Sequence, residues 1–288
     1  MNQTQSKPLT DWIGSTEFRE DSISLAPALG VAAMLDLQGT ALHAGDSLPP
    51  LWHWFYFLPQ APASQIGSDG HPKRGGFLPP VDLPRRMFAG ARMTFFAPLC
   101  VGEPATREGE VLAVQEKTGK SGRLVFVTVR YRIRDAAGTL CIEEVQDIVY
   151  KEPGGSVPRP VPVSRLPDLP PDAWCRVVTP SEVLLFRFSA LTFNAHRIHY
   201  DRPYAMNEEG YPGLVVHGPL TALMLAELVR QQDGGRLHTF EFRGRSPLFD
   251  LNAFRLVGRK SNGTVDLQAQ GPDGKTAMTA VAEIAAQS

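Results

Sequence analysis

The chain has 288 residues, of which 43% are hydrophobic and 20% are charged, values that are typical of a globular protein. This length is enough for one large domain or two ordinary ones. The 29 basic and 30 acidic residues leave a net charge of −1, so no overall field favours nucleic acid or an anionic membrane. We therefore expect neither a nucleic-acid nor a membrane partner.

The cysteines and the N-terminal segment bear on the cellular compartment. Cys100, Cys141 and Cys175 are too widely spaced to suggest a metal-ligand pair or a disulfide framework. The N-terminal segment is polar and lacks the apolar stretch of a signal peptide, and no apolar run reaches transmembrane length. We expect a cytoplasmic protein without a metal.

The first half begins with a helical segment and an aromatic run. Residues 27–37 are expected to form a helix with proline in its first turn. Residues 51–58, Leu-Trp-His-Trp-Phe-Tyr-Phe-Leu, are expected to be a buried core segment or, alternatively, the wall of an apolar ligand cavity. Residues 59–90 are rich in proline and glycine and are expected to form a long loop, whose cations either bind phosphates or lie in solvent.

Strands are expected from residue 92 onward. The clearest signal is the alternation of Val125, Val127 and Val129, which is typical of a strand with one buried face. The predicted strands of the first half are 92–98, 105–117, 124–135 and 139–151, with a hairpin turn at 135–138.

A proline-rich stretch at 153–172 is expected to be a stiff linker between an N-terminal domain at 1–152 and a C-terminal domain at 173–288. The second half contains an apolar helix at 218–230 and predicted strands at 237–245, 252–260, 264–270 and 275–285. The order of strands, turns and hairpin echoes that of the first half. We interpret this as a divergent internal duplication of an α+β unit.

Polar side chains are concentrated just before the apolar helix. Asn194, His196, His199 and Asp201 lie within eight residues. A metal site lacks a third ligand at a recognisable spacing, and Ser189 lacks the glycines of a nucleophile elbow. General acid–base catalysis by His199, with Asp201 orienting the imidazole, fits these residues better. The alternative is that the histidines have structural roles in loops and core.

The start of the helix favours the catalytic interpretation. His217-Gly218-Pro219 places a residue without a Cβ at a helix N-terminus, where free N–H groups and the helix dipole stabilise negative charge. The Gly218 N–H is therefore expected to hold a thioester oxygen while His199 handles a proton of water. The chemistry expected from this pair is hydration or dehydration next to a carbonyl.

Residues 186–228 resemble the catalytic region of the MaoC-like, hotdog-fold enoyl-thioester hydratases. The resemblance aligns His199-Tyr-Asp201 with the family's His-x-Asp, Ala205 with its small residue, and His217-Gly218 with its helix start. It places Asn194 on the catalytic aspartate and His196 on an asparagine, and both are departures from the family pattern. An amide can orient water but cannot be its base, so His199 remains the expected proton carrier.

The variant Leu-Thr-Phe-Asn-x-His-Arg-Ile-His-Tyr-Asp-Arg-Pro-Tyr is similar to a branch that contains mitochondrial type-2 hydroxyacyl-thioester dehydratases and bacterial mesaconyl-C4-CoA or itaconyl-CoA hydratases. The aromatic run and Arg74-Gly-Gly-Phe-Leu-Pro-Pro80 also resemble the bacterial members. The resemblance implies a double hotdog, in which each half is a curved antiparallel sheet wrapped on a long helix. It implies a catalytic C-terminal half and a degenerate N-terminal half.

The implied function is hydration of a branched C5 dicarboxylyl-CoA to citramalyl-CoA, as in itaconate degradation. Asn194, His199 and Gly218 would be catalytic, with His196, Asp201 and His217 in support. The candidate cations for a substrate carboxylate are Arg197, Arg202 and Arg243. Coenzyme A would be part of the substrate, so no cofactor is expected, and exposed hairpin edges favour a homodimer.

Two alternatives stay open. One is a dehydratase of straight-chain 3-hydroxyacyl thioesters, which an apolar tunnel without a buried arginine would favour. The other is a non-catalytic subunit that binds acyl thioesters, because Asn194 replaces an aspartate.

Overall fold

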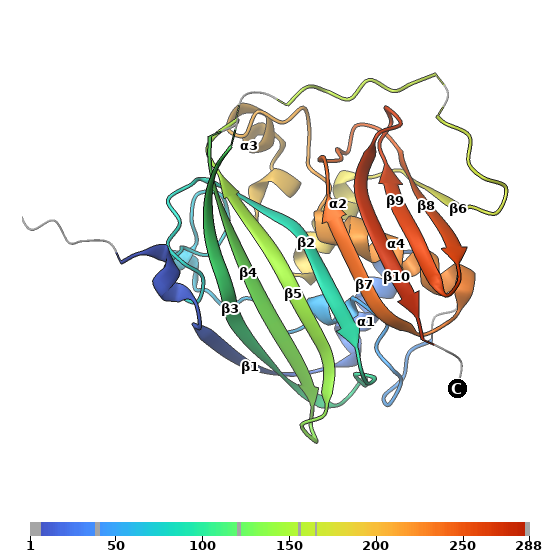
Figure 1. The fold of residues 1–288 in the computed structure, drawn as a ribbon, viewed down its shortest axis with the longest axis horizontal. Helices are drawn as coiled ribbons and strands as arrows, with labels where there is room; N and C mark the ends of the chain where they lie inside the picture. Colours follow the sequence, from blue (N-terminus) through green and yellow to red (C-terminus); the bar gives the residue numbers. More distant parts are fainter. Residues whose placement is uncertain (1–6, 38–40, 120–121, 155–156, 165, 286–288) are drawn as a thin grey trace, which may run out of the picture.

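The computed structural model describes residues 7–37, 41–119, 122–154, 157–164 and 166–285. Its main feature is a single ten-stranded antiparallel sheet (Figure 1). The strand order is β1-β3-β4-β5-β2-β7-β10-β9-β8-β6. The strands are β1 (Thr16–Ser22), β2 (Arg85–Phe95), β3 (Pro104–Gly119), β4 (Gly122–Asp135), β5 (Leu140–Lys151), β6 (Trp174–Val178), β7 (Leu237–Gly244), β8 (Phe254–Ser261), β9 (Thr264–Gln270) and β10 (Thr276–Ile284).

The sheet consists of two halves with the same strand order. The order in the first half is β1-β3-β4-β5-β2. The second half has the equivalent order β6-β8-β9-β10-β7. The halves join where β2 pairs with β7, with Ala91 opposite Phe242. The expected pair of antiparallel sheets is thus present as one continuous sheet, and the matching orders support the internal duplication.

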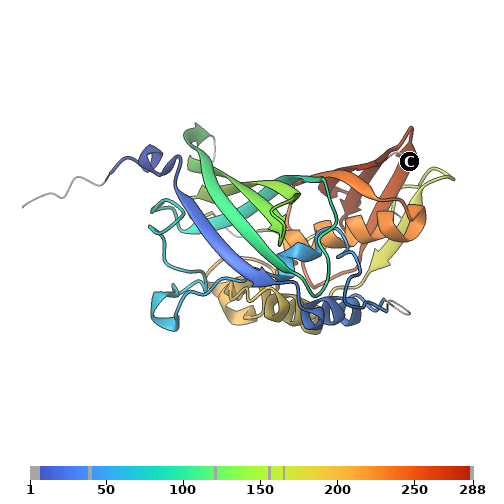
Figure 2. The same cartoon turned by 90° about the horizontal axis from the view of Figure 1, so that it is seen from below.

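The four α-helices lie on one face of the sheet (Figure 2). They are α1 (Leu25–Met34), α2 (Glu182–Leu191), α3 (Arg202–Asn207) and α4 (Gly218–Asp233). Short 3₁₀ helices occur at Leu9–Trp12, Trp52–Phe55, Ala63–Gln65 and Arg197–His199. None of these helices in the described part of the chain is long and apolar enough to cross a membrane.

Helix α4 is the central helix of the second half. Every residue from Leu220 to Val229 is buried, and the helix contacts β8, β9 and β10. It ends at Gly234, whose φ of 70° is the left-handed conformation that glycine adopts readily at a helix end. The predicted helix at 218–230 is therefore present and three residues longer.

The first half does not contain an equivalent long helix. Helix α1 has ten residues and packs against α2. The expectation of a long helix in each half thus holds only for the second half.

The loop before β2 covers a separate small core in the first half. In this core Leu83 and Val81 pack with Val111, Val125 and Val127 of the strands.

One strand near this loop differs from the sequence-based expectation. Strand β2 begins at Arg85, seven residues before the predicted start at 92, so Arg85 and Arg86 belong to the sheet. The register of β2 places Arg86 opposite Tyr150 of β5. The predicted linker at 153–172 lies between β5 and β6, and its described residues contain neither helix nor strand.

Candidate active site

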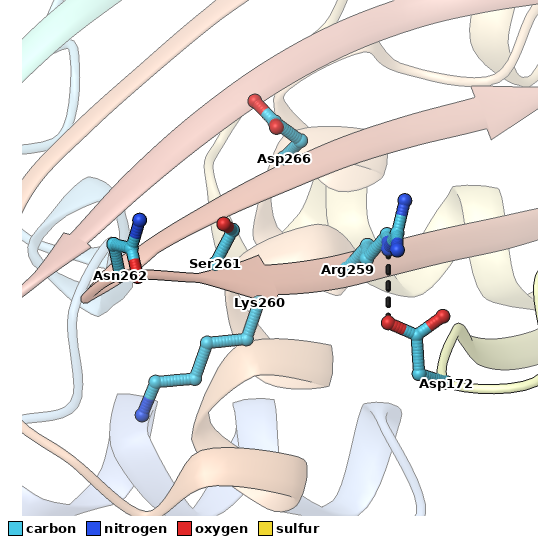
Figure 3. Close-up of a pocket in the computed structure, with 6 residues that line it drawn as sticks. All are labelled: Asp172, Arg259, Lys260, Ser261, Asn262 and Asp266. Carbon is cyan, nitrogen blue, oxygen red and sulfur yellow. Dashed lines mark hydrogen bonds and ion pairs between the residues drawn. The ribbon is translucent and has the colours of Figure 1, made fainter.

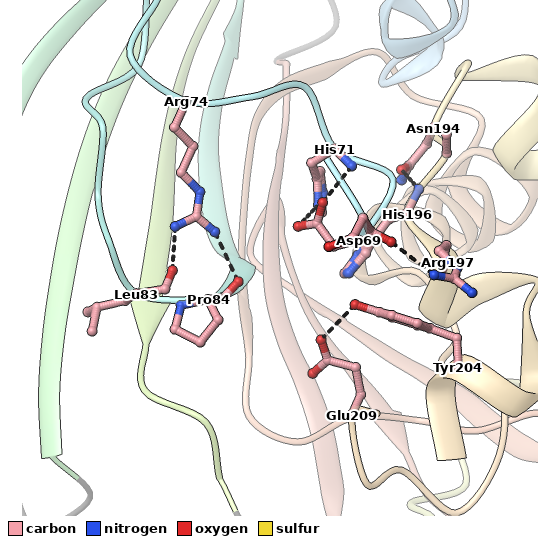
Figure 4. Close-up of polar contacts among 12 residues, drawn as sticks. Asp69, His71, Arg74, Leu83, Pro84, Asn194, His196, Arg197, Tyr204 and Glu209 are labelled. Atoms are coloured by element: carbon pink, nitrogen blue, oxygen red, sulfur yellow. Dashed lines mark hydrogen bonds and ion pairs between the residues drawn. The ribbon is translucent and has the colours of Figure 1, made fainter. Parts of the chain in front are cut away.

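Four of the seven histidines lie in a row near the start of α4. His199 ends a 3₁₀ helix, and its ring stacks on that of His217 with a centroid separation of 3.6 Å. His196 meets His199 edge-on at 5.3 Å. His71, from the loop of the first half, lies 4.1 Å from His196 (Figure 4). The row therefore combines residues from both halves of the chain.

A backbone carbonyl fixes the tautomer of His199. Its Nδ1 lies 2.7 Å from the Val215 carbonyl oxygen. A carbonyl can only accept a hydrogen bond, so the neutral ring carries its proton on Nδ1. The lone pair is then on Nε2, for which the described residues provide no hydrogen-bond partner. A neutral imidazole oriented in this way is suited to act as a general base.

The surroundings keep these imidazoles neutral. Burial lowers the pKa of His199 to about 4, although the bond to Val215 opposes the shift. Burial, followed by the charges of His71 and His199, lowers the pKa of His196 to about 2. Burial also lowers the pKa of His217 well below 6.5. At neutral pH each ring can therefore accept a proton, but none is a ready donor of one.

His217 anchors this row to α2. Its Nε2 lies 2.9 Å from the Ser189 hydroxyl, and its ring packs on Phe188. Its Nδ1 is buried without a hydrogen-bond partner in the described structure. Because His217 is also the N-cap residue of α4, its ring ties the helix start to His199.

Gly218 begins α4 beside these rings. A Cβ built at this position would have Phe88 O, at 3.9 Å, as its nearest neighbour, and φ is not positive. Neither packing nor backbone conformation therefore requires glycine here. The Gly218 N–H has no acceptor among the described residues, and it lies at the positive end of a 16-residue helix. This position can accept an oxyanion that approaches closely.

Asn194 precedes the histidines in a tight turn. Its Oδ1 accepts a hydrogen bond from the backbone N–H of His196, at 3.0 Å. The side-chain NH₂ has no acceptor among the described residues, so it can donate to a ligand or to water. Oδ1 keeps a second lone pair, but an amide does not take up a proton at neutral pH.

Asp201 does not orient His199, so that expectation is wrong. One carboxylate oxygen caps α3 by accepting from the Tyr204 N–H, and the other forms an ion pair with Arg197 at 2.8 Å. The carbonyl of Val215 takes the orienting role instead. The sequence missed it because a backbone carbonyl brought close by folding has no residue-type signature.

The three arginines expected to bind the substrate carboxylate are either paired with acidic residues or lie away from the histidines. Arg197 binds Asp201 and the Ser68 carbonyl, and Arg202 binds Asp250 and Glu182. Arg243 is 60% exposed and lies near Glu241. Its neighbour Phe242 is buried against the core, so Arg243 points to the opposite face of the sheet from the histidines. None of the three is a free cation beside the imidazoles.

Sequence reasoning missed Asp69 and His71, and it considered Arg86 only as one of the loop cations that either bind phosphates or lie in solvent. Asp69 and His71 flank Gly70 in the long loop (Figure 4). Arg86 is half-buried on β2, and its side chain has no ion pair or hydrogen bond within the described structure. Its charge is one of the causes, after burial, that lower the pKa values of His71 and His196. The unusual length of the loop was the only available signal.

A second hollow on the surface is a weaker candidate for the active site. A polar hollow near the β8–β9 hairpin is lined by Asp172, Arg259, Lys260, Ser261, Asn262 and Asp266 (Figure 3). Arg259 is paired with Asp172, and the hollow contains no imidazole. Among the described residues, no three His, Cys, Asp or Glu side chains form a group that could hold a metal ion. The imidazole row is therefore the candidate site.

Comparisons with known proteins identify the family of this chain. The family model of hydroxyacyl-thioester dehydratase type 2 matches residues 51–250, which include the whole row. The mesaconyl-C(4)-CoA hydratase of Chloroflexus aurantiacus is 59% identical over 95% of this chain and 96% of its own length. The mitochondrial hydroxyacyl-thioester dehydratase type 2 of Schizosaccharomyces pombe is 32% identical over 73% of this chain and 77% of its own.

Solved structures share the fold. A MaoC-like dehydratase superposes with a TM-score of 0.69 and 16% identity, covering 97% of this chain and all of its own. A Mycobacterium tuberculosis protein with a double hotdog fold has a TM-score of 0.59 and 13% identity, covering 94% of this chain and 96% of its own. The chain thus has a double hotdog fold, and it belongs to the hydroxyacyl-thioester dehydratase type 2 family as an enzyme of the hydratase/dehydratase class.

Proposed function

We propose that this enzyme hydrates mesaconyl-C4-CoA, a branched C5 dicarboxylyl thioester, to citramalyl-CoA. The observation that carries the proposal is the free Nε2 of His199 beside the N-terminus of α4. The name of the Chloroflexus aurantiacus relative supports the choice of substrate, because its similarity extends over nearly the whole chain.

The geometry matches addition of water to a double bond conjugated with a thioester. His199 Nε2 takes a proton from water as the water oxygen bonds to the β-carbon. The electrons of the double bond move onto the thioester oxygen, where the Gly218 N–H and the α4 dipole stabilise the charge. The proton then returns from His199 to the α-carbon. Every atom of water is thus added, and the enzyme is unchanged.

Conjugation also distinguishes the two C5 thioesters. In mesaconyl-C4-CoA the double bond is adjacent to the thioester carbonyl, so negative charge can reach the oxygen near Gly218. In itaconyl-CoA a methylene group separates them, and a helix N-terminus at the carbonyl gives no such stabilisation. We therefore propose mesaconyl-C4-CoA as the preferred substrate.

Arg86 is the cation that we propose for the substrate carboxylate. In mesaconyl-C4-CoA this carboxylate is bonded to the carbon that water attacks, so its partner must lie close to the base. Arg86 is near His71 and His196 and has no acidic partner in the described structure. Its guanidinium can form charge-assisted hydrogen bonds with a carboxylate.

A substrate panel tests the reaction. Purified protein receives mesaconyl-C4-CoA, itaconyl-CoA, crotonyl-CoA and a long-chain enoyl-CoA, and hydration is measured as loss of enoyl-thioester absorbance with a mass gain of one water. We expect the highest kcat/KM with mesaconyl-C4-CoA. A higher value with a straight-chain thioester would contradict the proposed substrate but not the chemistry.

Replacing Arg86 tests the origin of the preference. Arg86→Gln should lower kcat/KM for mesaconyl-C4-CoA by about 10- to 100-fold, the loss expected for hydrogen bonds to a charged group. It should change crotonyl-CoA hydration far less, because that substrate has no carboxylate. Arg243→Gln is the matched control and should leave both values unchanged. Equal losses with both substrates would contradict the role of Arg86.

We also propose that the protein is a cytoplasmic homodimer that needs no added cofactor. The edge strands β1 and β6 expose Phe18 and Val177, at 63% and 65%. Apolar residues on unpaired edges favour association with a second copy. Light scattering of the purified protein measures the mass, and a monomer at micromolar concentration would contradict the dimer.

A further inference from the structure

The loop that carries His71 is fitted closely to the catalytic segment. The Arg197 N–H donates to the Asp69 carbonyl at 2.9 Å, and the Arg197 guanidinium donates to the Ser68 carbonyl at 3.0 Å. Gly70 has a φ of 91°, and a Cβ there would lie 1.7 Å from the Ala195 carbonyl oxygen. Only glycine fits this contact. The backbone thus holds the loop directly against the residues that precede His199.

Within this loop Asp69 orients His71. One carboxylate oxygen accepts the His71 backbone N–H at 3.0 Å, and the other lies 3.2 Å from Nδ1 (Figure 4). Hydrogen bonds from His71, together with the charges of His71 and His196, outweigh burial and lower the pKa of Asp69. The carboxylate is therefore ionised and holds the proton of His71 on Nδ1. The lone pair on Nε2 is left free beside the other imidazoles.

This arrangement supplies what Asn194 lacks. The family pattern has a carboxylate where this chain has Asn194, and the neutral amide oxygen, which also accepts from the His196 N–H, is a weaker acceptor than a carboxylate. We infer that His71, positioned by Asp69, is the second hydrogen-bond acceptor for the attacking water and replaces the missing carboxylate. His71 would contact the reacting water and be a catalytic residue, whereas Asp69 would be a positioning residue.

The inference rests on the proposed function and adds one contact to it. One hydrogen of water goes to His199 Nε2, while the other is held by His71 Nε2. His71 neither gains nor loses a proton overall, so the balance of the hydration step is unchanged. Burial lowers the pKa of His71 and keeps the ring neutral, and the charges of Arg86 and Arg74 contribute to this shift. His196 packs against the ring at 4.1 Å.

Kinetics of His71→Ala test this role with the enoyl-CoA that the unmodified enzyme hydrates fastest. We expect kcat to fall by about 100-fold or more with KM changed little, because the water loses an acceptor needed in the transition state. His43→Ala is the matched control. His43 also lies beside an aspartate, Asp46, but its side chain is 75% exposed, and kcat should not change. An unchanged kcat in His71→Ala would overturn the inference.

Restoring a carboxylate separates catalysis from folding. Asn194→Asp in the His71→Ala background should recover at least about tenfold in kcat, because the new carboxylate can accept from water. Asp69→Asn should lower kcat less than His71→Ala, since an amide oxygen still accepts from Nδ1. Failure of the double variant to recover activity, with an unchanged melting temperature, would also overturn the inference. The outcome does not depend on which thioester the unmodified enzyme prefers.

Discussion

The two halves of the sheet share one strand order but differ in what covers their concave faces. In the second half α4 extends for 16 residues along β8, β9 and β10. Between α1 and β2, the described residues of the first half form the short 3₁₀ helices Trp52–Phe55 and Ala63–Gln65 and a long loop, but no long helix. The strand scaffold has therefore been kept while the central helix has been retained only once.

This difference divides the work of the site. The helix-containing half supplies His199, His217 and the free N–H of Gly218. The first half, which lacks an equivalent of α4, supplies Arg86 from strand β2 and His71 from its loop. Where the second half has its long helix, the first half has a loop that contacts the other half at Ala195 and Arg197. The degenerate half is thus, on our proposal, part of the binding site rather than only a support for it.

The largest expected effect comes from the helix-containing half. His199→Ala should lower kcat by about 100- to 10,000-fold, because the variant lacks the general base. Steady-state hydration of the preferred thioester measures this loss. The exposed His238 on β7 provides a control, since His238→Ala removes an imidazole from the same half but away from the row. Near-full activity of His199→Ala would refute the mechanism.

The pH dependence should show the same base. Because burial lowers the pKa of His199 to about 4, kcat/KM should fall only as the pH approaches that value, rather than near 6.5.

The free energy of unfolding should begin to decrease at a higher pH than kcat/KM does. The unfolded chain binds protons to histidine below about pH 6.5 and the folded chain does not, so unfolding becomes easier as the pH falls. Each neutral imidazole contributes at most about 1.4 kcal/mol per pH unit. Activity and chemical denaturation measured from pH 4 to 8 test both trends.

Gly218→Ala should have the next largest effect. The added methyl meets no protein atom closer than 3.9 Å, so folding should be preserved. It would, however, occupy the space that a thioester oxygen needs, and we expect kcat/KM to fall by about 100-fold or more. An unchanged melting temperature, measured in parallel, would assign the loss to substrate approach. Full activity would show that the oxyanion is held elsewhere.

Local patterns in the sequence predicted much of the fold. Strand β9 has the predicted bounds of 264–270, because alternation continues between two clear turns. The sequence also predicted a helix at 218–230, where an apolar segment follows Gly218-Pro219, and α4 continues to Asp233. Strand β1, Thr-Glu-Phe-Arg-Glu-Asp-Ser, was missed because it is a mostly polar edge strand with no buried residue. The first fully buried residue, Ile23, lies just beyond its end.

The site was predictable only in part. His199, His217 and Gly218 are close in sequence, and short-range spacing indicated that they act together. His71 and Arg86 are more than a hundred residues away from His199, and only the pairing of the two halves brings them near it. Asp201 misled the prediction because a carboxylate two residues from a histidine can equally well cap the next helix, as it does here.

A smaller effect is expected at the contact between the halves. Trp52 of the 3₁₀ helix donates from Nε1 to Glu227 of α4 at 3.0 Å, and both side chains are buried. Trp52→Phe removes this donor, so we expect a loss of about 1–3 kcal/mol in the free energy of unfolding. Urea denaturation measures it. Arg230 still pairs with Glu227, so a larger loss would show that the short helix is more important for joining the halves than its one hydrogen bond suggests.

The smallest effect on catalysis is expected at Asp201. Asparagine can cap α3 as aspartate does, so Asp201→Asn should lose only the half-exposed ion pair with Arg197. Because the Val215 carbonyl orients His199, kcat should stay within about twofold of the original value. Steady-state kinetics distinguish this outcome from a dyad mechanism, in which loss of the Asp201 charge would lower kcat by orders of magnitude. A loss of that size would mean that Asp201 turns toward His199 when substrate binds, and the C-terminal half would then contain a carboxylate–imidazole pair without any contribution from the N-terminal loop.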